Sequence, residues 1–427
     1  MSTRQLFKTA PFFILLIAVN SIVDYSSLPL HNITIWWIIQ LITLLMFWRF
    51  KSILETTINN YDMRVVKWYL LWNVICIIRG LFVAETYWDW KGFTSASLGI
   101  LVPIVAFSAS CLPLWQSIIK FFLKFGLPLF LLLSFAISKD AYGFFLVPVT
   151  FLLFFLPVIP FKGKIIITFF AIWVMFADVT ARSNVIKFGV PFVLLLVYWT
   201  RNIVPVKILE VCRIVLIVTP IILFSLAVTD TFNVFKINEY VSGDYTKSKV
   251  NADGEVVDES LTTDTRTFLY EEVLGTAKKY NTWIIGRSPA RGNETVWFAD
   301  LAEITGRKER LWNEAAILNV FMWTGIVGVA LYLLVFNRAS YMAINHSNNI
   351  YSKMLGLFMA FRWGYAWVED GNFFNITTVF LWFMLGICLT TSFRSMTDEE
   401  VKNWIGEIFG KRNIKEELEE LEMQLNA

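Results

Sequence analysis

The sequence predicts an all-α integral membrane protein with about twelve membrane-spanning helices and one large loop on the outer side. Three observations lead to this prediction: the composition, the lengths of the apolar runs, and the placement of Lys and Arg between the runs. Of the 427 residues, 56% are hydrophobic and only 17% are charged, and the mean hydropathy is +0.58. A soluble protein carries about 25% charged residues, so this composition suits lipid rather than water.

The apolar runs are each roughly the 17–25 residues that a helix needs to cross the hydrocarbon core. They lie at approximately 10–24, 33–49, 66–84, 94–112, 114–137, 141–160, 164–180, 184–200, 206–228, 314–336, 354–370 and 373–392. Backbone amides in lipid need internal partners, so these runs are expected to be helical. The first run follows Arg4 and Lys8, as a signal peptide would. No small-residue cleavage pattern follows it, so we predict an uncleaved first helix.

Lys and Arg alternate between the segments that connect these runs. One set of segments, beginning with the N-terminus, contains Arg4, Lys8, Arg49, Lys51, Arg64, Lys67, Lys120, Lys162, Lys164, Arg201, Lys207, Arg213, Arg338 and Lys353. The other short segments contain only Lys91, Lys139, Arg182 and Lys187. Because cations collect on the cytoplasmic side, both termini are predicted to be cytoplasmic. The predicted organisation is helices 1–9 over 1–228, the outer loop over 229–313, helices 10–12 over 314–392 and a cytoplasmic C-terminal segment over 393–427.

The outer loop between helices 9 and 10 begins with a polar run over 239–264 that contains a turn signal at Asn251–Gly254. An amphipathic helix is predicted from Asp264 to Tyr280, capped by Asp264 or Thr265. Its apolar face is formed by Phe268, Leu269, Val273, Leu274 and Ala277. An Arg- and Gly-rich stretch follows, with Gly286, Arg287, Pro289, Arg291 and Gly292.

The C-terminal segment contains a second amphipathic pattern. Thr397 and Glu400 have the spacing of a capping box, which predicts the start of a helix. Its apolar face, formed by Val401, Trp404, Ile405 and Ile408, is predicted to lie on the inner membrane surface. Ile414, Leu418, Leu421 and Leu425 repeat at heptad spacing, but the repeat is too short to predict a coiled coil.

Several classes of function are excluded by composition. The net charge of +3 and the lack of a basic cluster give no support for a nucleic-acid partner. The two histidines, His31 and His346, fall in predicted loops on opposite sides, and no His/Cys/carboxylate pattern supports a metal site or a Ser-His triad. The four cysteines lie in or beside apolar runs, so they predict no disulfide framework. No phosphate-binding Gly-Lys-Ser/Thr loop is present.

Arg182 and Lys187 are the first candidate site residues, because they lie at an outer junction of two spans where cations are disfavoured. A salt bridge from Arg182 to Asp178 is the structural alternative. Arg266, Arg287 and Arg291 of the outer loop form a second group. The planar guanidinium fork suits phosphate. Because the loop also holds Glu271, Glu272 and Glu294, solvated surface charges are the alternative there.

Glu314, where the outer loop turns back into a helix, is the third candidate, with the alternative that it only caps that helix. A fourth group of charges lies at membrane depth or near outer helix ends. Its members are Arg79, Arg362, Glu85, Glu369 and Asp370. Charges at such depths predict either a polar interior or structural ion pairs.

Three stretches of the chain resemble motifs of the O-antigen ligase and O-antigen polymerase family. Ala181-Arg182-Ser183 resembles the Ser-Arg-Ser/Thr stretch of that family. Thr265-Arg266-Thr267 through Leu274, closing on Ile285-Gly286, resembles its Arg-led loop helix. The segment from Glu314 to Gly328, ending Trp323-Thr324-Gly325-Ile326-Val327-Gly328, resembles its helix with a Gly-Ile-Val-Gly ending. Ligases of the family usually carry a His where this chain has Glu314, which favours a polymerase.

The resemblance implies glycosyl transfer without metal, nucleotide or cofactor on the outer, periplasmic face of the bacterial inner membrane. The donor would be a glycan on undecaprenyl diphosphate, and a protein that regulates chain length would be a possible partner. Arg182 and Arg266 would stabilise the leaving diphosphate, and Glu314 would accept the proton of the attacking hydroxyl. Lys187, Arg287 and Arg291 would bind the diphosphate or the glycan. Displacement with one base would invert the anomeric configuration.

Two alternatives stay open. In a ligase, the acceptor would be lipid A-core instead of another lipid-linked unit. A membrane transporter or flippase is the alternative from another class, although the sequence has no internal repeat and its carboxylates cluster at outer helix ends. Flat faces for sugar rings are offered by Trp88, Trp90, Trp283 and Trp297, but the general preference of Trp for membrane interfaces is the favoured explanation for them.

Overall fold

The computed structural model describes residues 3–55, 61–178, 181–236, 246–250, 256–260, 266–298, 301–369 and 372–410. Most of these residues are helical. The helices are α1 (Thr3–Asn20), α2 (Ile33–Glu55), α3 (Arg64–Leu81), α4 (Tyr87–Leu101), α5 (Leu112–Phe121), α6 (Leu127–Leu133), α7 (Tyr142–Phe145), α8 (Val147–Leu153), α9 (Phe161–Ala177), α10 (Arg182–Trp199), α11 (Val206–Val228), α12 (Thr267–Lys279), α13 (Leu301–Thr305), α14 (Ala316–Asn345), α15 (Ile350–Tyr365), α16 (Ile376–Leu389), α17 (Thr391–Arg394) and α18 (Asp398–Phe409).

Short irregular helices complete the bundle: 3-10 segments at Val23–Tyr25, Tyr61–Met63, Val102–Ser110 and Lys139–Ala141, and a π turn at Phe122–Gly126. Two small antiparallel pairs of strands lie between α11 and α14. Strand β1 (Thr246–Val250) pairs with β2 (Val256–Ser260), and β3 (Asn293–Glu294) pairs with β4 (Glu309–Arg310). The predicted turn at 251–254 lies outside the described residues, between β1 and β2.

Several of the helices have the length and composition of membrane-spanning segments. Within the described ranges, 6 helical segments are long and apolar enough to cross a bilayer. They are Gln5–Tyr25, Ile33–Lys51, Tyr87–Ser110, Leu112–Leu133, Val206–Val228 and Ala316–Asn345. Each apolar run predicted from the sequence is helical over most of its length, so the predicted helical conformation is confirmed. The chain is therefore an all-α membrane protein.

The bundle packs around α16, whose residues are all buried. Trp115 of α5 stacks on Phe383 of α16 with their ring centroids 3.5 Å apart. At Gly386, a Cβ atom would lie 2.3 Å from the carbonyl oxygen of Ala106, so glycine permits this close helix contact. Peripheral helices have many large apolar side chains on their outer surfaces, for example Phe176 of α9 at 68% exposure and Val211 of α11 at 59%. These surfaces are suited to lipid.

Helix α14 is broken at Gly325, where φ is 67° and ψ is −170°. The segment that follows α12 crosses this break and satisfies its backbone. The amide of Ile326 donates to the carbonyl of Trp283 at 2.9 Å. The amide of Arg287 donates to the carbonyl of Met322 at 2.6 Å. Irregular backbone at membrane depth is stable only when protein groups satisfy it in this way.

Two side chains of α3 strengthen the same crossing. The indole nitrogen of Trp72 donates to the carbonyl of Thr324 at 2.9 Å. Arg79 donates to the carbonyls of Ile285 and Gly286 at 2.6 and 3.0 Å. The loop stretch and the helix ending that the sequence singled out separately are thus joined directly in the fold.

Gly325→Ala is expected to destabilise the protein by about 2 kcal/mol or more, since a side chain is strained at this positive φ. A Cβ atom at this position would also lie 2.2 Å from the carbonyl oxygen of Ile284. The apparent Tm in detergent measures the effect. Gly275→Ala in α12 is the matched control: its Cβ would meet nothing within 4 Å, and alanine favours a helix by about 1 kcal/mol. An unchanged Tm for Gly325→Ala would contradict the importance of the break.

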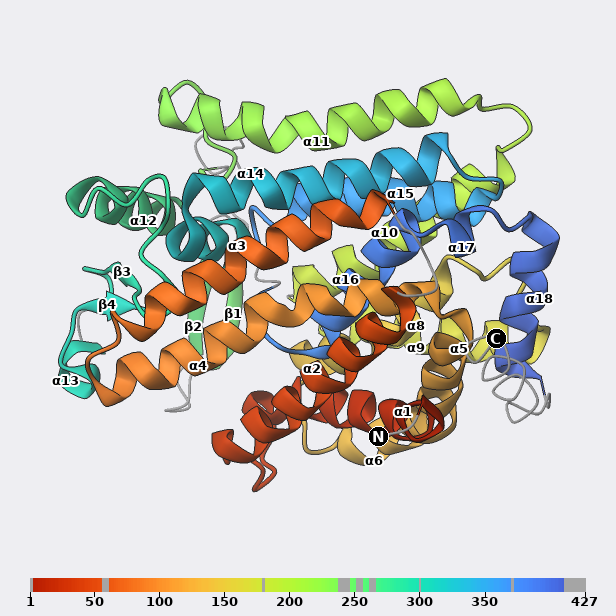
Figure 1. The fold of residues 1–427 in the computed structure, drawn as a ribbon, viewed down its shortest axis with the longest axis horizontal. Helices are drawn as coiled ribbons and strands as arrows, with labels where there is room; N and C mark the ends of the chain where they lie inside the picture. Colours follow the sequence, from red (N-terminus) through yellow and green to blue (C-terminus); the bar gives the residue numbers. More distant parts are fainter. Residues whose placement is uncertain are drawn as a thin grey trace.

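Helix α12 and the C-terminal helices lie at opposite ends of the bundle (Figure 1). Figure 1 shows α12, α13, β3 and β4 at one end and α17 and α18 at the other. The predicted loop helix is confirmed as α12, with Leu269, Val273 and Ala277 buried. Asp264 and Thr265 lie outside the described residues. Arg266 occupies the N-cap position of α12 and forms no capping hydrogen bond with its side chain.

The predicted capping box at the start of α18 is confirmed, since Thr397 and Glu400 bind each other's backbone amides. The placement of the apolar face on the membrane surface is wrong. Val401, Trp404, Ile405 and Ile408 are buried within the protein. The side-chain amide of Gln116 in α5 donates to the carbonyl of Trp404 at 2.9 Å. The apolar face of α18 therefore packs against other helices of the same chain. The heptad positions at 414–425 lie outside the described residues.

Candidate functional site

A cavity of about 1350 Å³ opens among the ends of α2, α4, α10, α12, α14 and α15 and the segment that follows α1. Each of these ends belongs to the side that the Lys/Arg distribution predicts to be outside. The cavity therefore lies at the end of the bundle that holds the 229–313 loop. Trp36, Trp37, Trp88 and Trp312 line it together with polar and charged groups. Of the tryptophans singled out from the sequence, Trp88 lines the cavity, whereas Trp283 packs against Phe321.

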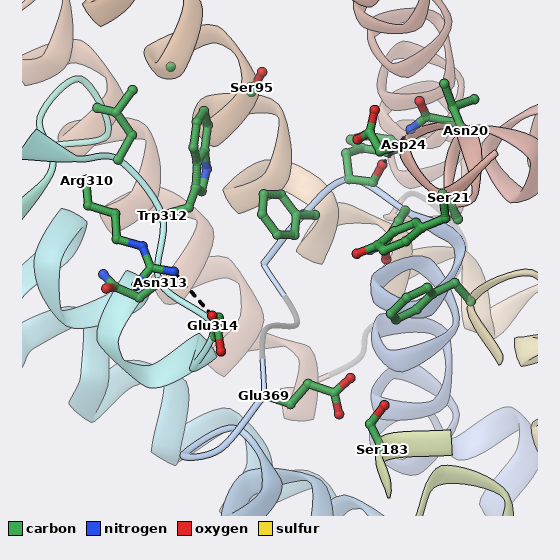
Figure 2. Close-up of a pocket in the computed structure, with 18 of the residues that line it drawn as sticks. Asn20, Ser21, Asp24, Ser95, Ser183, Arg310, Trp312, Asn313, Glu314 and Glu369 are labelled. Atoms are coloured by element: carbon green, nitrogen blue, oxygen red, sulfur yellow. Dashed lines mark hydrogen bonds and ion pairs between the residues drawn. The ribbon is translucent and has the colours of Figure 1, made fainter. Parts of the chain in front are cut away.

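Glu314 lies between two arginines in this cavity. Nη1 of Arg266 binds Oε2 of Glu314, and Nη2 of Arg310 lies 3.4 Å from Oε1. Figure 2 shows Arg310 directed at Glu314 across the lining. The Glu314 side chain is 49% exposed, whereas those of Arg266 and Arg310 are 27% and 15% exposed. The carboxylate is therefore accessible and held by two positive charges.

The helix-cap explanation for Glu314 is wrong. Helix α14 begins at Ala316, with Ala315 in the N-cap position and no side-chain capping hydrogen bond. The Glu314 carboxylate instead binds arginines from two other segments. A cap interacts with backbone amides of its own helix, so these contacts need a different explanation.

Arg182 is the first residue of α10 and lines the same cavity as Arg266 and Glu314. The side chain is exposed, and the neighbouring Ser183 also faces the cavity (Figure 2). The structure thus brings together the three residues that the sequence singled out for catalysis. The salt bridge from Arg182 to Asp178 stays a prediction.

Lys187 lies behind the cavity wall. Its side chain is 6% exposed, binds Oε1 of Glu369 and lies 4.7 Å from the ring centroid of Phe144. Glu369 lines the cavity, and its Oε2 atom is buried without a hydrogen-bond partner among the described residues. Lys187 therefore holds Glu369 and does not line the cavity itself. The direct contact with substrate that was predicted for Lys187 is not seen in this arrangement.

Arg287 and Arg291 do not line the cavity either; both bind Glu309, which does. Nη2 of Arg287 lies 3.3 Å from Oε1 of Glu309, and Nε of Arg291 donates to Oε2 at 3.0 Å. Burial on its own would raise the pKa of Glu309. The hydrogen bond from Arg291 and the charges of the nearby arginines outweigh burial and lower the pKa below its ordinary value. The contacts of Arg287 and Arg291 with Glu309 hold strand β4 in place, and β4 also contains Arg310.

Glu309→Gln is expected to lower the apparent Tm at neutral pH, by a loss on the order of 3 kcal/mol for a buried ion pair. Because the pKa of Glu309 is lower in the folded state, its ionised carboxylate stabilises the protein. This stabilisation is complete above the pKa of Glu in the unfolded state, near 4.5. This stabilisation is lost as the pH falls through the folded-state value. The Tm difference between wild type and Glu309→Gln should therefore shrink below pH 4.5. Thermal scans from neutral to acidic pH measure it, and a difference that is independent of pH would contradict this role.

Two charges of the fourth group, Glu85 and Glu369, form ion pairs. Arg307 lies 2.5 Å from Oε2 of Glu85 and 3.2 Å from Oδ2 of Asp89, which ties the outer loop to α4. Glu369 pairs with Lys187, as described above. Arg362 lies over the ring of Tyr365 at 5.4 Å. Asp370 lies outside the described residues.

No family model matches this chain, and no curated protein sequence matches it. The site must therefore be interpreted from its own residues. Within the described ranges, no group of three or more His, Cys, Asp or Glu side chains is positioned to hold a metal ion. What the cavity offers chemically is a set of guanidinium groups around an accessible carboxylate.

Sequence reasoning missed Arg310, and with it the second partner of Glu314. The signal was the charged run Arg307-Lys308-Glu309-Arg310 immediately before Glu314. Alternating charges in a loop are equally typical of a solvated surface, so the run alone does not indicate a site. The fold buries Glu309 and partly buries Arg310, whose guanidinium lies 4.4 Å from the ring centroid of Phe298.

Proposed function

We propose that this chain polymerises oligosaccharide repeat units carried on undecaprenyl diphosphate, at the periplasmic face of the bacterial inner membrane. The observation that carries the proposal is the convergence of Arg182, Arg266 and Arg310 with Glu314 in one cavity. The resemblance of the surrounding stretches to the O-antigen ligase and polymerase family gives these residues their proposed roles. The product would be O-antigen, capsule or exopolysaccharide.

The cavity suits a large anionic glycolipid. Its volume of about 1350 Å³ exceeds the 300–1,000 Å³ typical of small-molecule sites. The arginines offer planar forks for phosphate oxygens, and the tryptophans offer flat faces for sugar rings. Lipid-facing surfaces on the neighbouring helices would let a polyprenyl tail stay in the bilayer while its diphosphate enters from the side.

The proposed reaction is a single inverting displacement. The acceptor hydroxyl attacks the anomeric carbon, and the bond to the diphosphate oxygen breaks. Its electron pair leaves with undecaprenyl diphosphate, whose growing charge Arg182, Arg266 and Arg310 stabilise. Glu314 accepts the proton of the hydroxyl. Lys187, Arg287 and Arg291 act indirectly, because they hold Glu369 and Glu309 in the cavity wall.

Cells that lack the chain test the proposal against its alternatives. A polymerase defect should leave surface glycan of a single repeat unit, because single units still reach their final acceptor. Accumulation of full-length polymer on undecaprenyl diphosphate would instead identify a ligase. Repeat units retained on the cytoplasmic side would identify a flippase. Either of the last two outcomes would overturn the proposed polymerisation.

We further propose twelve crossings, cytoplasmic termini and a periplasmic 229–313 loop, on the basis of the Lys/Arg asymmetry. Ser248→Cys, in β1, is expected to react with a membrane-impermeant maleimide added outside the inner membrane. Asn348→Cys, between α14 and α15, should react only after permeabilisation. Both variants need Cys212→Ser, because Cys212 is exposed. The reverse pattern would overturn the topology and the outer location of the site.

A further inference from the structure

We infer that Glu314 is a built-in competitor for the donor diphosphate: it holds Arg266 and Arg310 until the diphosphate replaces it, and only then acts as the base. This inference rests on the proposed function and adds a regulatory step to the same site. The catalytic base would thereby be released by donor binding itself.

The ion-pair geometry supports this exchange. One oxygen of Glu314 binds Arg266 and the other faces Arg310, so each carboxylate oxygen is engaged by one arginine. In this arrangement the carboxylate faces two guanidinium groups rather than an acceptor hydroxyl, so it must leave them before it can act as the base. The side chain is 49% exposed, so it can move away without losing a packed environment.

The two arginines are positioned independently of Glu314. Nε of Arg266 donates to the carbonyl of Val368 at 3.3 Å, and the guanidinium of Arg310 lies 4.4 Å from the ring centroid of Phe298. Nη1 of Arg310 is buried and has no hydrogen-bond partner within the described residues. A diphosphate has more charge and more acceptor oxygens than one carboxylate, so it can displace Glu314 from the arginines.

The chemical step follows the exchange of Glu314 for the diphosphate. After the diphosphate binds the arginines, the freed Glu314 carboxylate accepts the proton of the acceptor hydroxyl. The hydroxyl oxygen forms its bond to the anomeric carbon, and the bond from that carbon to the diphosphate breaks. When undecaprenyl diphosphate leaves, Glu314 loses its proton to water and binds the arginines again. Donor must therefore bind before the base can activate the acceptor.

Binding of farnesyl diphosphate, a short lipid diphosphate, to the full-length protein in nanodiscs tests this exchange by calorimetry. Glu314→Gln removes the competing charge and should tighten binding about tenfold, which corresponds to about 1.4 kcal/mol. Glu314→Asp keeps the charge on a shorter side chain and should bind with intermediate affinity. It also serves if the Gln variant does not fold.

Asp24→Asn is the matched control for general electrostatics. Asp24 lines the same cavity, and Figure 2 places it on the opposite side from Arg310 and Glu314. Its effect should be below about twofold, because it lies away from the pair of arginines. Equal tightening by Asp24→Asn and Glu314→Gln, or none by Glu314→Gln, would overturn the competitor role while leaving the proposed function intact. No binding by the wild-type protein would overturn both.

Discussion

Glu314→Gln is expected to slow repeat-unit polymerisation by roughly a hundredfold or more, because it removes the proposed proton acceptor while keeping the size of the side chain. The fold should be retained, since Gln can still accept a hydrogen bond from Arg266 or Arg310, and the side chain is 49% exposed. The measurement is the rate of polymer formation in membranes, normalised to the amount of folded protein.

The same variant separates catalysis from binding. If Glu314 is both base and competitor, the Gln variant should turn over slowly although it binds the diphosphate more tightly. A residue that only positions the arginines would lose binding and rate together. Wild-type turnover by Glu314→Gln would contradict the proposed base.

Arg266→Ala is expected to lower polymer formation by roughly a thousandfold, the range seen when a preorganised cation is removed from a phosphate-transfer site. Arg182→Ala should have a comparable effect, because Arg182 lines the same cavity. Lys at either position should restore only part of the activity, since a point charge does not bind two phosphate oxygens in one plane. Polymer length and yield, compared at equal protein levels, measure the effect.

Arg201→Ala is the matched control for the loss of a cation. Arg201 is an exposed arginine at the opposite end of α10, where its guanidinium lies 4.1 Å from the ring centroid of Tyr198. It is predicted to be cytoplasmic and should leave polymer formation unchanged. Near-normal polymer in both Arg182→Ala and Arg266→Ala would show that these arginines are ordinary surface cations.

Local patterns in the sequence predicted the helices well. Apolar runs of bilayer length became helices, the face of α12 is buried at Leu269 and Val273, and the Thr397–Glu400 capping box formed as expected. These features depend on residues close together in the chain. Helix periodicity and capping are local in this sense, so a single sequence is enough to predict them.

Features that depend on distant partners could not be predicted in this way. The apolar face of α18 has the same residue pattern whether lipid or protein covers it. In the fold, contacts with protein, including α5, cover this face. The break at Gly325 is stable only because the segment after α12 satisfies its backbone. Likewise, Arg287 and Arg291 resembled phosphate ligands until the fold placed Glu309 between them.

The most direct test of the proposed function is reconstitution of the purified chain in liposomes with undecaprenyl-diphosphate-linked repeat units, in EDTA and without nucleotide. We expect longer lipid-linked glycans, one undecaprenyl diphosphate released per new bond, and an inverted anomeric configuration at each new linkage. Repeat units that cross the bilayer or remain unchanged, with no release of undecaprenyl diphosphate, would contradict the proposed function.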